Sequence, residues 1–492
     1  MQNRMNLGDL LAEIPHSILQ GSEDIEVSGV AFDTRKILGG EVFVCIVGTQ
    51  VDGHDFIAQA AEKGAAAVVV TRDVTAPEGV TVVRVEDDRK ALSLLACDWY
   101  GNPSRSLTTI GITGTKGKTT TAYMIYNMLN GAGIPCGLIG TVEIIIGDEH
   151  IHATHSTPES LLVQEYMARM RDAGLKAVVM EVSSQGLKMD RVYGIRYDFG
   201  LFMNLEPDHI GGNEHPTFED YRDCKKKLFT MCRKGIFNAD DSHCAEMMDG
   251  CTCEAITFGA SEGCDYRMTD TQLINEPGRK GVSYRVTGRE DLSVETEIPG
   301  RFTMYNSLAA LVVGCEMNLP RETMLNALSK VRVRGRVESV PVSDRFTVLL
   351  DYAHNGMSLR SLLSTLREYN PKRLVCMFGC GGNRAKDRRY DMGEISSKMA
   401  DLTVVTSDNP RFEEPEDIIA DILIGVKKGP GKYVTVPDRR EAIAYVLAHA
   451  EDGDCVVIAG KGHEDYQEIR GVKHHMDDRE MILEEAARLG LK

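Results

Sequence analysis

Short apolar runs alternate with amphipathic stretches along the chain, and this alternation predicts an α/β protein. The first hundred residues contain three such runs, at residues 42–47, 66–70 and 80–83. The C-terminal third contains four, at residues 347–351, 374–379, 402–406 and 455–460. Helical patterns between them begin near Ser358, Arg388, Pro415 and Asp438. This rhythm is typical of a parallel, doubly wound sheet.

Two segments separate the chain into three parts. "GNPSRS" at residues 101–106 is a turn-rich linker, and "VRVRGRVE" at residues 331–338 is a basic segment whose glycine suits a hinge. Because a domain typically contains roughly 150 residues, a chain of 492 residues suggests three domains. We expect an N-terminal domain at residues 1–104, a central domain with a mostly parallel sheet at 105–334, and a Rossmann-like C-terminal domain at 335–492.

Composition excludes several classes of protein. The net charge of −17 argues against a nucleic-acid partner, which needs a basic surface, and against binding to anionic membranes. No apolar run approaches the ~18 residues of a membrane span, and the longest, residues 65–70, fits a buried strand. The N-terminus "MQNRMNLGDLLAEIP" has no signal-peptide pattern. We therefore expect no membrane insertion and a cytoplasmic location.

Thirteen cysteines are scattered over the whole length. An odd number without a secretory signal indicates reduced thiols. The cluster Cys244, Cys251, Cys253 and Cys264 lacks paired C-x₂-C spacing and lies in a turn-rich stretch, which disfavours a zinc site.

The stretch "TTIGITGTKGKTTTAYMIYNML" predicts a phosphate-binding loop between an apolar strand and a helix over residues 118–131. Glycines let the backbone amides face phosphate oxygens, and the helix N-terminus adds partial positive charge. Lys118 can reach the β- and γ-phosphates, and the Thr119 hydroxyl can bind Mg²⁺. The strict spacing is not met, because Ile112 stands where the first glycine belongs. The alternative is a glycine-rich turn, but strand, loop and helix in this order favour a P-loop ATPase-type domain.

Three further features could complete a nucleotide site. Glu181 ends the apolar strand of "KAVVMEVSSQG", and His209 follows the strand before "EPDHIGG". "YRDCKKKLF" places three lysines, Lys225 to Lys227, on a predicted helix. Taken singly, each has a structural alternative, because adjacent lysines commonly form a solvated face and a lone histidine is commonly structural.

"VVTSDNPRFEEP" at residues 404–415 places an arginine at the end of a strand. Pro410 stops the strand because it has no N–H to donate. Arg411 therefore lies on a loop at the strand's C-terminal end, where ligands usually bind in open α/β sheets. The structural alternative for Arg411 is an ion pair with Glu413 or Glu414.

Together these motifs resemble the Mur ligase family of cell-wall amide-bond synthetases. "GTKGKTT", "EVSS", "NLEPDH", "YRDCK", "YNSLAA", "GRVE" and "DYAH" occur in the family's order over residues 107–354. "FDTR" and "VGTQVDGHDFI" resemble its uridine-binding N-terminal domain, and "HSTPES" its muramoyl-dipeptide loop. "GCGGNR", "DNPR" and "GKGHE" resemble its C-terminal domain, so the resemblance spans nearly the whole chain.

The resemblance implies an ATP-dependent ligase of peptidoglycan precursor synthesis. Its expected reaction adds meso-diaminopimelate to the D-Glu side-chain carboxylate of UDP-MurNAc-L-Ala-D-Glu through an acyl phosphate. Mg²⁺ is the expected cofactor, ATP the co-substrate and a monomer the expected state. In the family "DNPR" marks diaminopimelate enzymes, because the guanidinium can hold a carboxylate that lysine lacks. Alternatives are the L-lysine-adding sister enzyme, a folylpolyglutamate-synthase-like ligase and a P-loop switch without ligase chemistry.

The resemblance also implies the site residues. Those with catalytic roles are Lys118, Glu181, His209 and Lys225, the last as a carbamylated lysine (N6-carboxylysine). Those near ATP are Gly114, Thr115, Lys116, Gly117, Lys118, Thr119, Thr120, Asn306, Arg336, Asp351 and His354. Metal ligands are Thr119, Glu181, His209 and Lys225. UDP-muramoyl-dipeptide contacts are Thr34, Thr49, Gln50, Val51, Ser156, Thr157, Ser183 and Arg191. Diaminopimelate contacts are Arg384, Asp408, Asn409, Pro410, Arg411, Gly460 and Glu464. Departures from the family pattern are Lys116, Met189, Gly211 and Asn355-Gly356.

Overall fold

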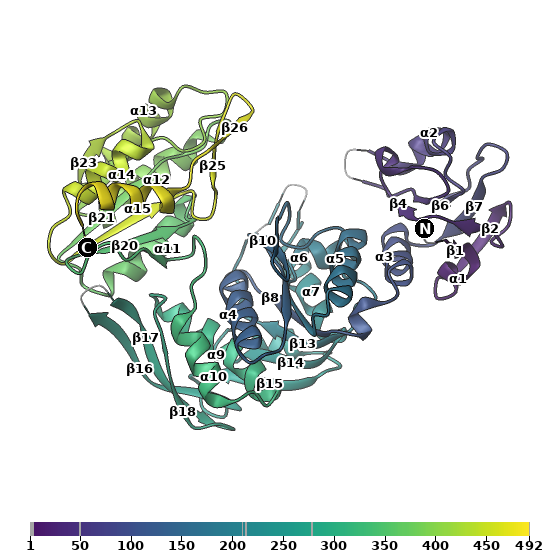
Figure 1. Ribbon diagram of the computed structural model, residues 1–492, viewed down its shortest axis with the longest axis horizontal. Coiled ribbons are helices and arrows are strands. Elements are labelled where there is room, and N and C mark those ends of the chain that lie inside the picture. The colour runs from purple at the N-terminus through teal and green to yellow at the C-terminus, as the bar shows by residue number, and fades with distance from the viewer. Residues whose placement is uncertain (1–3, 49–50, 209, 212–213, 277–278, 492) are drawn as a thin grey trace. The chain divides into compact units, whose positions relative to one another are not determined.

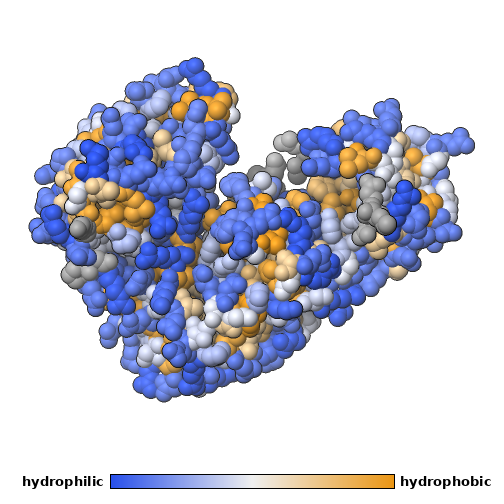
Figure 2. All heavy atoms as spheres, viewed as in Figure 1, coloured by the Kyte–Doolittle hydropathy of each residue, from blue (hydrophilic) through white to orange (hydrophobic). Residues whose placement is uncertain are grey.

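The computed structural model describes the whole chain except residues 1–3, 49–50, 209, 212–213, 277–278 and 492. The chain forms two compact units, one of residues 1–267 with 308–324 and the other of residues 268–307 with 325–492. In the described part, every helix is too short or too polar to cross a membrane. The face drawn in Figure 2 is mostly hydrophilic, with hydrophobic side chains in separate small patches. The division into three domains at residues 104 and 334 stays a prediction.

The first part of the chain folds around a five-stranded sheet (Figure 1). Its order is β2 (His16–Gln20), β7 (Thr81–Val85), β6 (Ala67–Val70), β5 (Val42–Val44), β4 (Val30–Ala31). A separate pair is β1 (Met5–Asn6) with β3 (Glu26–Val27), and the helices are α1 (Leu7–Leu11), α2 (Ile57–Glu62) and α3 (Asp88–Trp99). The predicted buried strand is confirmed, because every residue of β6 is buried and its side chains alternate between the cores on the two faces of the sheet.

The central sheet is mostly parallel, as predicted. The first eight of its eleven strands run in the order β11 (Glu149–His152), β10 (Glu143–Ile146), β9 (Cys136–Ile139), β12 (Ala177–Glu181), β8 (Thr108–Thr113), β13 (Tyr197–Phe202), β14 (Cys232–Asn238), β15 (Glu254–Gly259), and the three strands described next continue the sheet from β15. The helices are α4 (Lys118–Gly131), α5 (Ser160–Asp172), α6 (Ser184–Lys188), α7 (Phe218–Lys226) and α8 (Cys244–Met248). Helix α4 has the predicted bounds. Because β8 is parallel to both β12 and β13, the C-terminal ends of these three strands lie at one edge of the sheet.

The second unit begins with strands of an antiparallel ribbon and two helices. These are β16 (Tyr266–Glu276), β17 (Arg279–Gly288), β18 (Leu292–Thr296), α9 (Arg301–Glu316) and α10 (Arg321–Lys330), of which β16, α9 and α10 extend into the first unit. The C-terminal sheet has the order β19 (Glu338–Ser339), β20 (Thr347–Asp351), β24 (Asp454–Ala459), β21 (Arg373–Phe378), β22 (Leu402–Val405), β23 (Lys432–Thr435), and only β19 is antiparallel to its neighbour.

Helices cover both faces of the C-terminal sheet, which confirms the predicted doubly wound class (Figure 1). They are α11 (Gly356–Arg367), α12 (Lys386–Met399), α13 (Pro415–Val426), α14 (Arg439–Ala448) and α15 (Asp478–Arg488). Helix α12 contacts both α11 and α13, and α14 contacts α15. The four predicted helix starts lie within two residues of the observed ones.

The sequence reading missed a hairpin near the C-terminus, made of β25 (Tyr466–Ile469) and β26 (Val472–His475). Its two-residue turn, Arg470-Gly471, has positive φ at both positions, 49° and 80°. Such a turn matches the natural twist of paired strands and favours glycine. The hairpin also forms a one-residue parallel bridge, Arg411 to Ile469. The glycine between alternating residues was the signal that could have revealed it.

Candidate functional site

The predicted phosphate loop joins β8 to α4. Gly117 precedes the helix with a φ of 86°, a conformation that glycine adopts without penalty. At Gly114 a Cβ would lie 2.9 Å from the Cβ of Met203, so only glycine fits against that neighbour. Lys118 folds back over the loop and its Nζ donates to the carbonyls of Gly114 at 2.8 Å and Thr115 at 3.1 Å. Thr119 and Thr120 lie buried in the first turn of α4.

Asn204, just beyond β13, braces the loop from the side. Its Oδ1 accepts from the amide of Lys116 at 2.8 Å, and its Nδ2 donates to the Lys116 carbonyl at 3.1 Å. The Lys116 side chain, a departure from the family pattern, forms an ion pair with Glu206 at 2.6 Å. Sequence reasoning gave Asn204 no role, although it is the first residue of the quoted motif "NLEPDH".

Glu181 ends β12 with a side chain that is almost fully buried. Its carboxylate accepts from the hydroxyl of Thr119 at 3.1 Å, and from the amide and hydroxyl of Thr141 at 2.8 and 2.9 Å. In the part of the chain that the structure describes, no lysine or arginine forms an ion pair with it. A buried carboxylate beside a threonine hydroxyl is an oxygen donor set of the kind Mg²⁺ prefers, so these residues fit a magnesium ion. Thr141 was missed from the sequence.

Lys225 lies buried on α7 and does not share a solvated face with its neighbours. Its Nζ donates to the Gly114 carbonyl at 2.9 Å and lies 4.6 Å from the centre of the Tyr221 ring. Burial, and then the positive charge of Lys118, lower the pKa of Lys225 well below its usual value. Lys226 and Lys227 instead pair with Asp249 and Asp190, each at 3.7 Å. His209, the remaining predicted catalytic residue, lies outside the described residues.

The predicted muramoyl-dipeptide residues of the central sheet come together beside Glu181. Thr157 donates to Ser183 at 3.0 Å, and Arg191 Nη1 donates to the Thr157 carbonyl at 3.0 Å. The hydroxyl oxygens of Thr141 and Ser156 lie 2.8 Å apart, within hydrogen-bond distance. Through Thr141 and Glu181, hydrogen bonds therefore connect this group to Thr119 of the phosphate loop.

A buried histidine ties this group to the helix that carries Lys225. The ring of His215 contacts Asp220 through Nδ1 at 2.7 Å and the hydroxyl of Ser184 through Nε2 at 3.0 Å. Among described residues, His215, Asp220 and Cys224 form a group of metal-ligating type whose ligand atoms lie within 4.8 Å of one another. Because both ring nitrogens already have protein partners, this histidine is positioned to join α6 to α7. All thirteen cysteines, which lie in the described part, are free thiols.

The predicted uridine residues lie partly in a cavity of about 570 Å³ in the N-terminal part. Thr34 and Val51 line it, whereas Thr49 and Gln50 lie outside the described residues. The Thr34 hydroxyl donates to Gln59 at 2.8 Å. Arg89 also lines the cavity and is a cation that sequence reasoning did not select.

Four predicted ATP contacts belong to the second unit: Asn306, Arg336, Asp351 and His354. The Arg336 guanidinium lies over the ring of Tyr352 at 5.1 Å, and that ring lies 4.6 Å from the ring of His354. Asp351 is buried and accepts from two backbone amides at 2.8 and 2.9 Å. Burial raises the pKa of Asp351 and lowers that of His354.

The loop after β22 contains Asp408, Asn409, Pro410 and Arg411. The alternative interpretation of Arg411, an ion pair with Glu413 or Glu414, is wrong, because Glu413 pairs with Arg389 and Glu414 with Arg470. Arg411 instead donates from Nε to Glu468 at 3.1 Å and from Nη1 to the Gly382 carbonyl at 2.8 Å. The partner lies far along the chain, on a hairpin that the sequence reading had missed.

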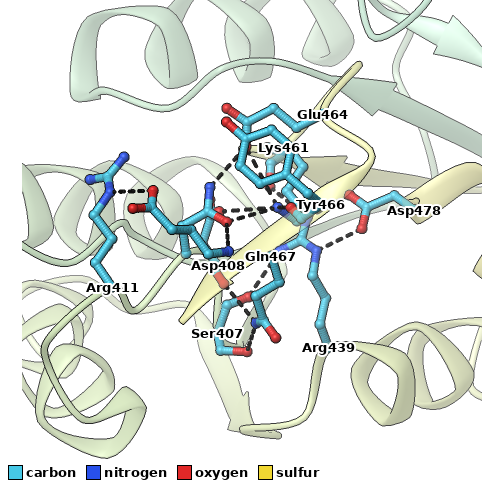
Figure 3. A network of polar contacts seen from close by, with 12 residues as sticks. Ser407, Asp408, Arg411, Arg439, Lys461, Glu464, Tyr466, Gln467 and Asp478 are labelled. Atoms are coloured by element: carbon cyan, nitrogen blue, oxygen red, sulfur yellow. Dashed lines mark hydrogen bonds and ion pairs between the residues drawn. The ribbon is translucent and has the colours of Figure 1, made fainter. Parts of the chain in front are cut away.

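A fully buried lysine, Lys461, supports this loop through polar contacts (Figure 3). Its Nζ lies 3.7 Å from Asp408 and 3.5 Å from Glu464, and donates to Asn409 at 3.3 Å and to the Tyr466 carbonyl. Asn409 in turn donates to Glu464 at 2.8 Å. Four loop and hairpin residues thus share one buried cation, which holds the predicted contacts Asp408, Asn409 and Glu464 together.

The two remaining predicted contacts differ in their surroundings. At Gly460, with a φ of 112°, a Cβ would lie 2.9 Å from an Asp408 oxygen, so glycine keeps the loop close. Arg384 is exposed and, within the described part, makes no hydrogen bond or ion pair. A second buried ion pair lies beneath, Arg439 with Asp478 at 2.6 Å (Figure 3).

Three protein-family models match the chain, and together they cover most of it. They are described as "Mur ligase family, catalytic domain" at residues 26–100, "Mur ligase middle domain" at residues 112–314, and "Mur ligase, glutamate ligase domain" at residues 335–462.

Curated relatives are similar over nearly their full length. A UDP-N-acetylmuramoyl-L-alanyl-D-glutamate--2,6-diaminopimelate ligase of Clostridium perfringens is 39% identical, with 97% of this chain and 99% of that protein covered. The protein of the same name from Caldanaerobacter subterraneus is 41% identical, with 98% of each chain covered.

Solved structures agree on the fold. A structure with the same enzyme name is 27% identical with a TM-score of 0.74, covering 99% of this chain and 100% of that chain. A Mycobacterium tuberculosis folylpolyglutamate synthase, 18% identical with a TM-score of 0.58, covers 80% of this chain and 93% of its own, and shares the fold alone. The order of motifs, the site geometry and these similarities lead to one conclusion: the chain belongs to the Mur ligase family.

Proposed function

We propose that the chain adds meso-2,6-diaminopimelate to the D-Glu side-chain carboxylate of UDP-MurNAc-L-Ala-D-Glu, with hydrolysis of ATP to ADP and phosphate. The protein is an ATP-dependent ligase, as members of its family are. The observation that carries the substrate choice is Arg411, on a loop at the carboxyl end of β22, whose guanidinium has N–H groups that make no hydrogen bond to the described residues. Relatives 36–41% identical over nearly the whole chain are named as ligases of this amino acid.

The chemistry needs activation because a carboxylate is a poor electrophile. Transfer of the γ-phosphoryl group to the D-Glu carboxylate gives an acyl phosphate, and the incoming amine then attacks its carbonyl carbon, with phosphate as the leaving group. Two anions must meet in the first step, so positioning and charge neutralisation are the protein's main contributions. Lys118 and the loop amides of Gly114 to Thr120 supply positive charge where the phosphates would lie.

The buried carboxylate of Glu181 and the Thr119 hydroxyl are proposed to hold Mg²⁺, together with His209 and Lys225. When bound, the ion would neutralise phosphate charge. Lys225 is suited to carbamylation, because the lowered pKa of this buried amine favours its neutral form, which is the form that reacts with carbon dioxide. The carbamate is an anion, so the modification would turn an amine, which repels a metal ion when protonated, into a ligand.

The three predicted domains take separate parts of the substrates in this proposal. Residues 1–104 hold the uridylyl end through the cavity at Thr34 and Val51. Residues 105–334 hold ATP and the dipeptide, the latter through Ser156, Thr157, Ser183 and Arg191. Residues 335–492 hold the amino acid and, through Arg336, Asp351 and His354, contribute to the nucleotide site.

A competition assay tests the proposal. Purified enzyme receives ATP, Mg²⁺, UDP-MurNAc-L-Ala-D-Glu and equimolar diaminopimelate and L-lysine, and products are separated by mass. We expect the diaminopimelate product to dominate and Arg411→Ala to lose that preference, because a far-end ammonium would face the Arg411 cation whereas a carboxylate pairs with it. Lys118→Ala is the inactive control. A wild type that prefers lysine, or phosphate release that ignores the amino acid, would contradict the proposal.

A further inference from the structure

The hairpin of β25 and β26 determines the backbone conformation of Arg411. The Arg411 amide donates to the Glu468 carbonyl at 2.9 Å, and the Arg470 amide donates to the Arg411 carbonyl at 2.6 Å. Arg411 therefore pairs with the hairpin as a one-residue strand. Its φ of 55° lies in the left-handed region, which residues with a side chain rarely adopt. The two backbone hydrogen bonds hold it there.

The same hairpin also holds the side chain of Arg411. A guanidinium has five N–H donors, one on Nε and two on each terminal nitrogen. Glu468 accepts from Nε at 3.1 Å, and the Gly382 carbonyl accepts from Nη1 at 2.8 Å. The remaining donors, one on Nη1 and both on Nη2, can bind a carboxylate with two parallel hydrogen bonds. Both side chains are about a quarter exposed, at 23% for Arg411 and 25% for Glu468.

Other acidic side chains near this loop are already engaged. Glu413 pairs with the buried Arg389 at 2.7 Å, and Glu414 pairs with Arg470 at 3.4 Å. Glu464 accepts from Asn409 at 2.8 Å. Among described residues, Glu468 is the acid within ion-pair distance of Arg411, so the orientation of the guanidinium depends on it.

We propose that Glu468 is a positioning residue for amino-acid selection, which holds the guanidinium of Arg411 so that its terminal N–H groups meet the far carboxylate of the amino acid. This inference rests on the proposed function, because it takes diaminopimelate as the amino acid that Arg411 binds. Glu468 does not itself touch the reacting atoms.

Two substitutions at Glu468 distinguish its role as a hydrogen-bond acceptor for Arg411 from the effect of its negative charge. Glu468→Ala removes the acceptor, so Arg411 can rotate away, and we expect the KM for diaminopimelate to rise about tenfold, a change equivalent to ~1.4 kcal/mol. The kcat at saturating diaminopimelate and the KM values for ATP and the UDP-linked dipeptide stay unchanged. Glu468→Gln retains an oxygen that accepts from Nε and restores most of the affinity. Glu414→Ala, which removes an exposed ion pair of the same loop, is the matched control and leaves all values unchanged.

A double-mutant cycle with Arg411→Ala supplies the decisive readout. If Glu468 acts through Arg411, Glu468→Ala adds no further rise in KM once Arg411 is gone, because the two effects are coupled. A penalty that persists in the Arg411→Ala background would instead show a general structural role. An unchanged KM in Glu468→Ala would show that Glu468 does not position Arg411, and a lower KM would show that Glu468 competes with the substrate. If the wild type selects diaminopimelate, any of these results overturns the inference and leaves the proposed function standing. A wild type that does not use diaminopimelate refutes the proposed function and the inference together.

Discussion

Replacement of Arg439 by methionine should destabilise the C-terminal sheet by several kcal/mol. Arg439 and Asp478 form a fully buried ion pair at 2.6 Å. The Arg439 guanidinium also donates to the carbonyls of Ser407 at 3.2 Å and Ala459 at 3.3 Å. These two residues directly precede Asp408 and Gly460, so the pair supports the loop on which the amino-acid site is built.

The size of the expected loss in stability depends on which buried groups each substitution leaves without a partner. Arg439→Met leaves the Asp478 carboxylate buried without a cation, which typically costs about 3–5 kcal/mol. A domain is stable by about 5–15 kcal/mol in total, so the loss is large. Adding Asp478→Leu removes the stranded charge, and the double variant should recover to within about 1–3 kcal/mol of wild type, because the two carbonyls still lack donors.

Hydrogen exchange followed by mass spectrometry is the suitable assay. The only tryptophan, Trp99, ends α3 in the N-terminal part, so its fluorescence does not report directly on the C-terminal sheet. Exchange in peptides that cover β22 and β24 measures local opening. Urea titrations in parallel give the free energy of unfolding, and the KM for diaminopimelate shows whether the loop moves.

Arg440→Met is the matched control, because Arg440 and its partner Glu484 are both about half exposed, and its second partner, the buried Glu485, keeps an ion pair with Arg488. Exposed pairs contribute about 0–1 kcal/mol. If Arg439→Met is no more destabilising than this control, or if the double variant is as unstable as the single one, the buried pair does not support the sheet as described.

Three further predictions concern the central part of the chain. Thr141→Val removes a hydroxyl donor to Glu181 and should lower turnover at limiting Mg²⁺ about tenfold, since a hydrogen bond to a charged group contributes about 1.5–3 kcal/mol; an unchanged Mg²⁺ dependence of phosphate release would contradict this. Because the pKa of Lys225 is lowered in the folded state, the unfolded chain binds more protons at pH values between that lowered pKa and ~10.4, so stability rises with pH across this window. Lys225→Met should flatten this rise in urea titrations without carbon dioxide, and parallel curves for the two proteins would refute it. Hydrogen bonds from Cys232 and, secondarily, Cys251 lower the pKa of Cys253 to about 7, against the opposing effect of burial. Cys253 should therefore be alkylated first at pH 7, as read by peptide mass spectrometry, and slower labelling than Cys251 would contradict this.

Local patterns in the sequence predicted most of the elements. The helix at residues 118–131 and the alternation of strands and helices in the C-terminal third were predictable, because hydrophobic periodicity and glycine or proline punctuation act over a few residues. Edge and hairpin strands such as β11 and β26 were not predicted, because they are largely exposed and lack an apolar pattern.

The contacts within the candidate site were less predictable. The motif residues were identifiable because their order resembles a known family, but Thr141, Asn204 and Glu468 were not selected. Each forms its hydrogen bond with a residue at least 40 positions away in the chain. Nothing within a single motif specifies such pairing, since it depends on which strand ends and loops meet.

The sequence by itself determined the α/β class, the phosphate loop and the placement of Arg411 after a strand, because these depend on short-range backbone preferences and on where a proline or glycine stands. Only the tertiary structure decided that Lys225 alone of three adjacent lysines is buried, and that Arg411 pairs with Glu468 instead of its neighbours Glu413 and Glu414. The reason is physical: burial and ion pairing depend on distance in space, and the long-range packing of strands and loops sets that distance.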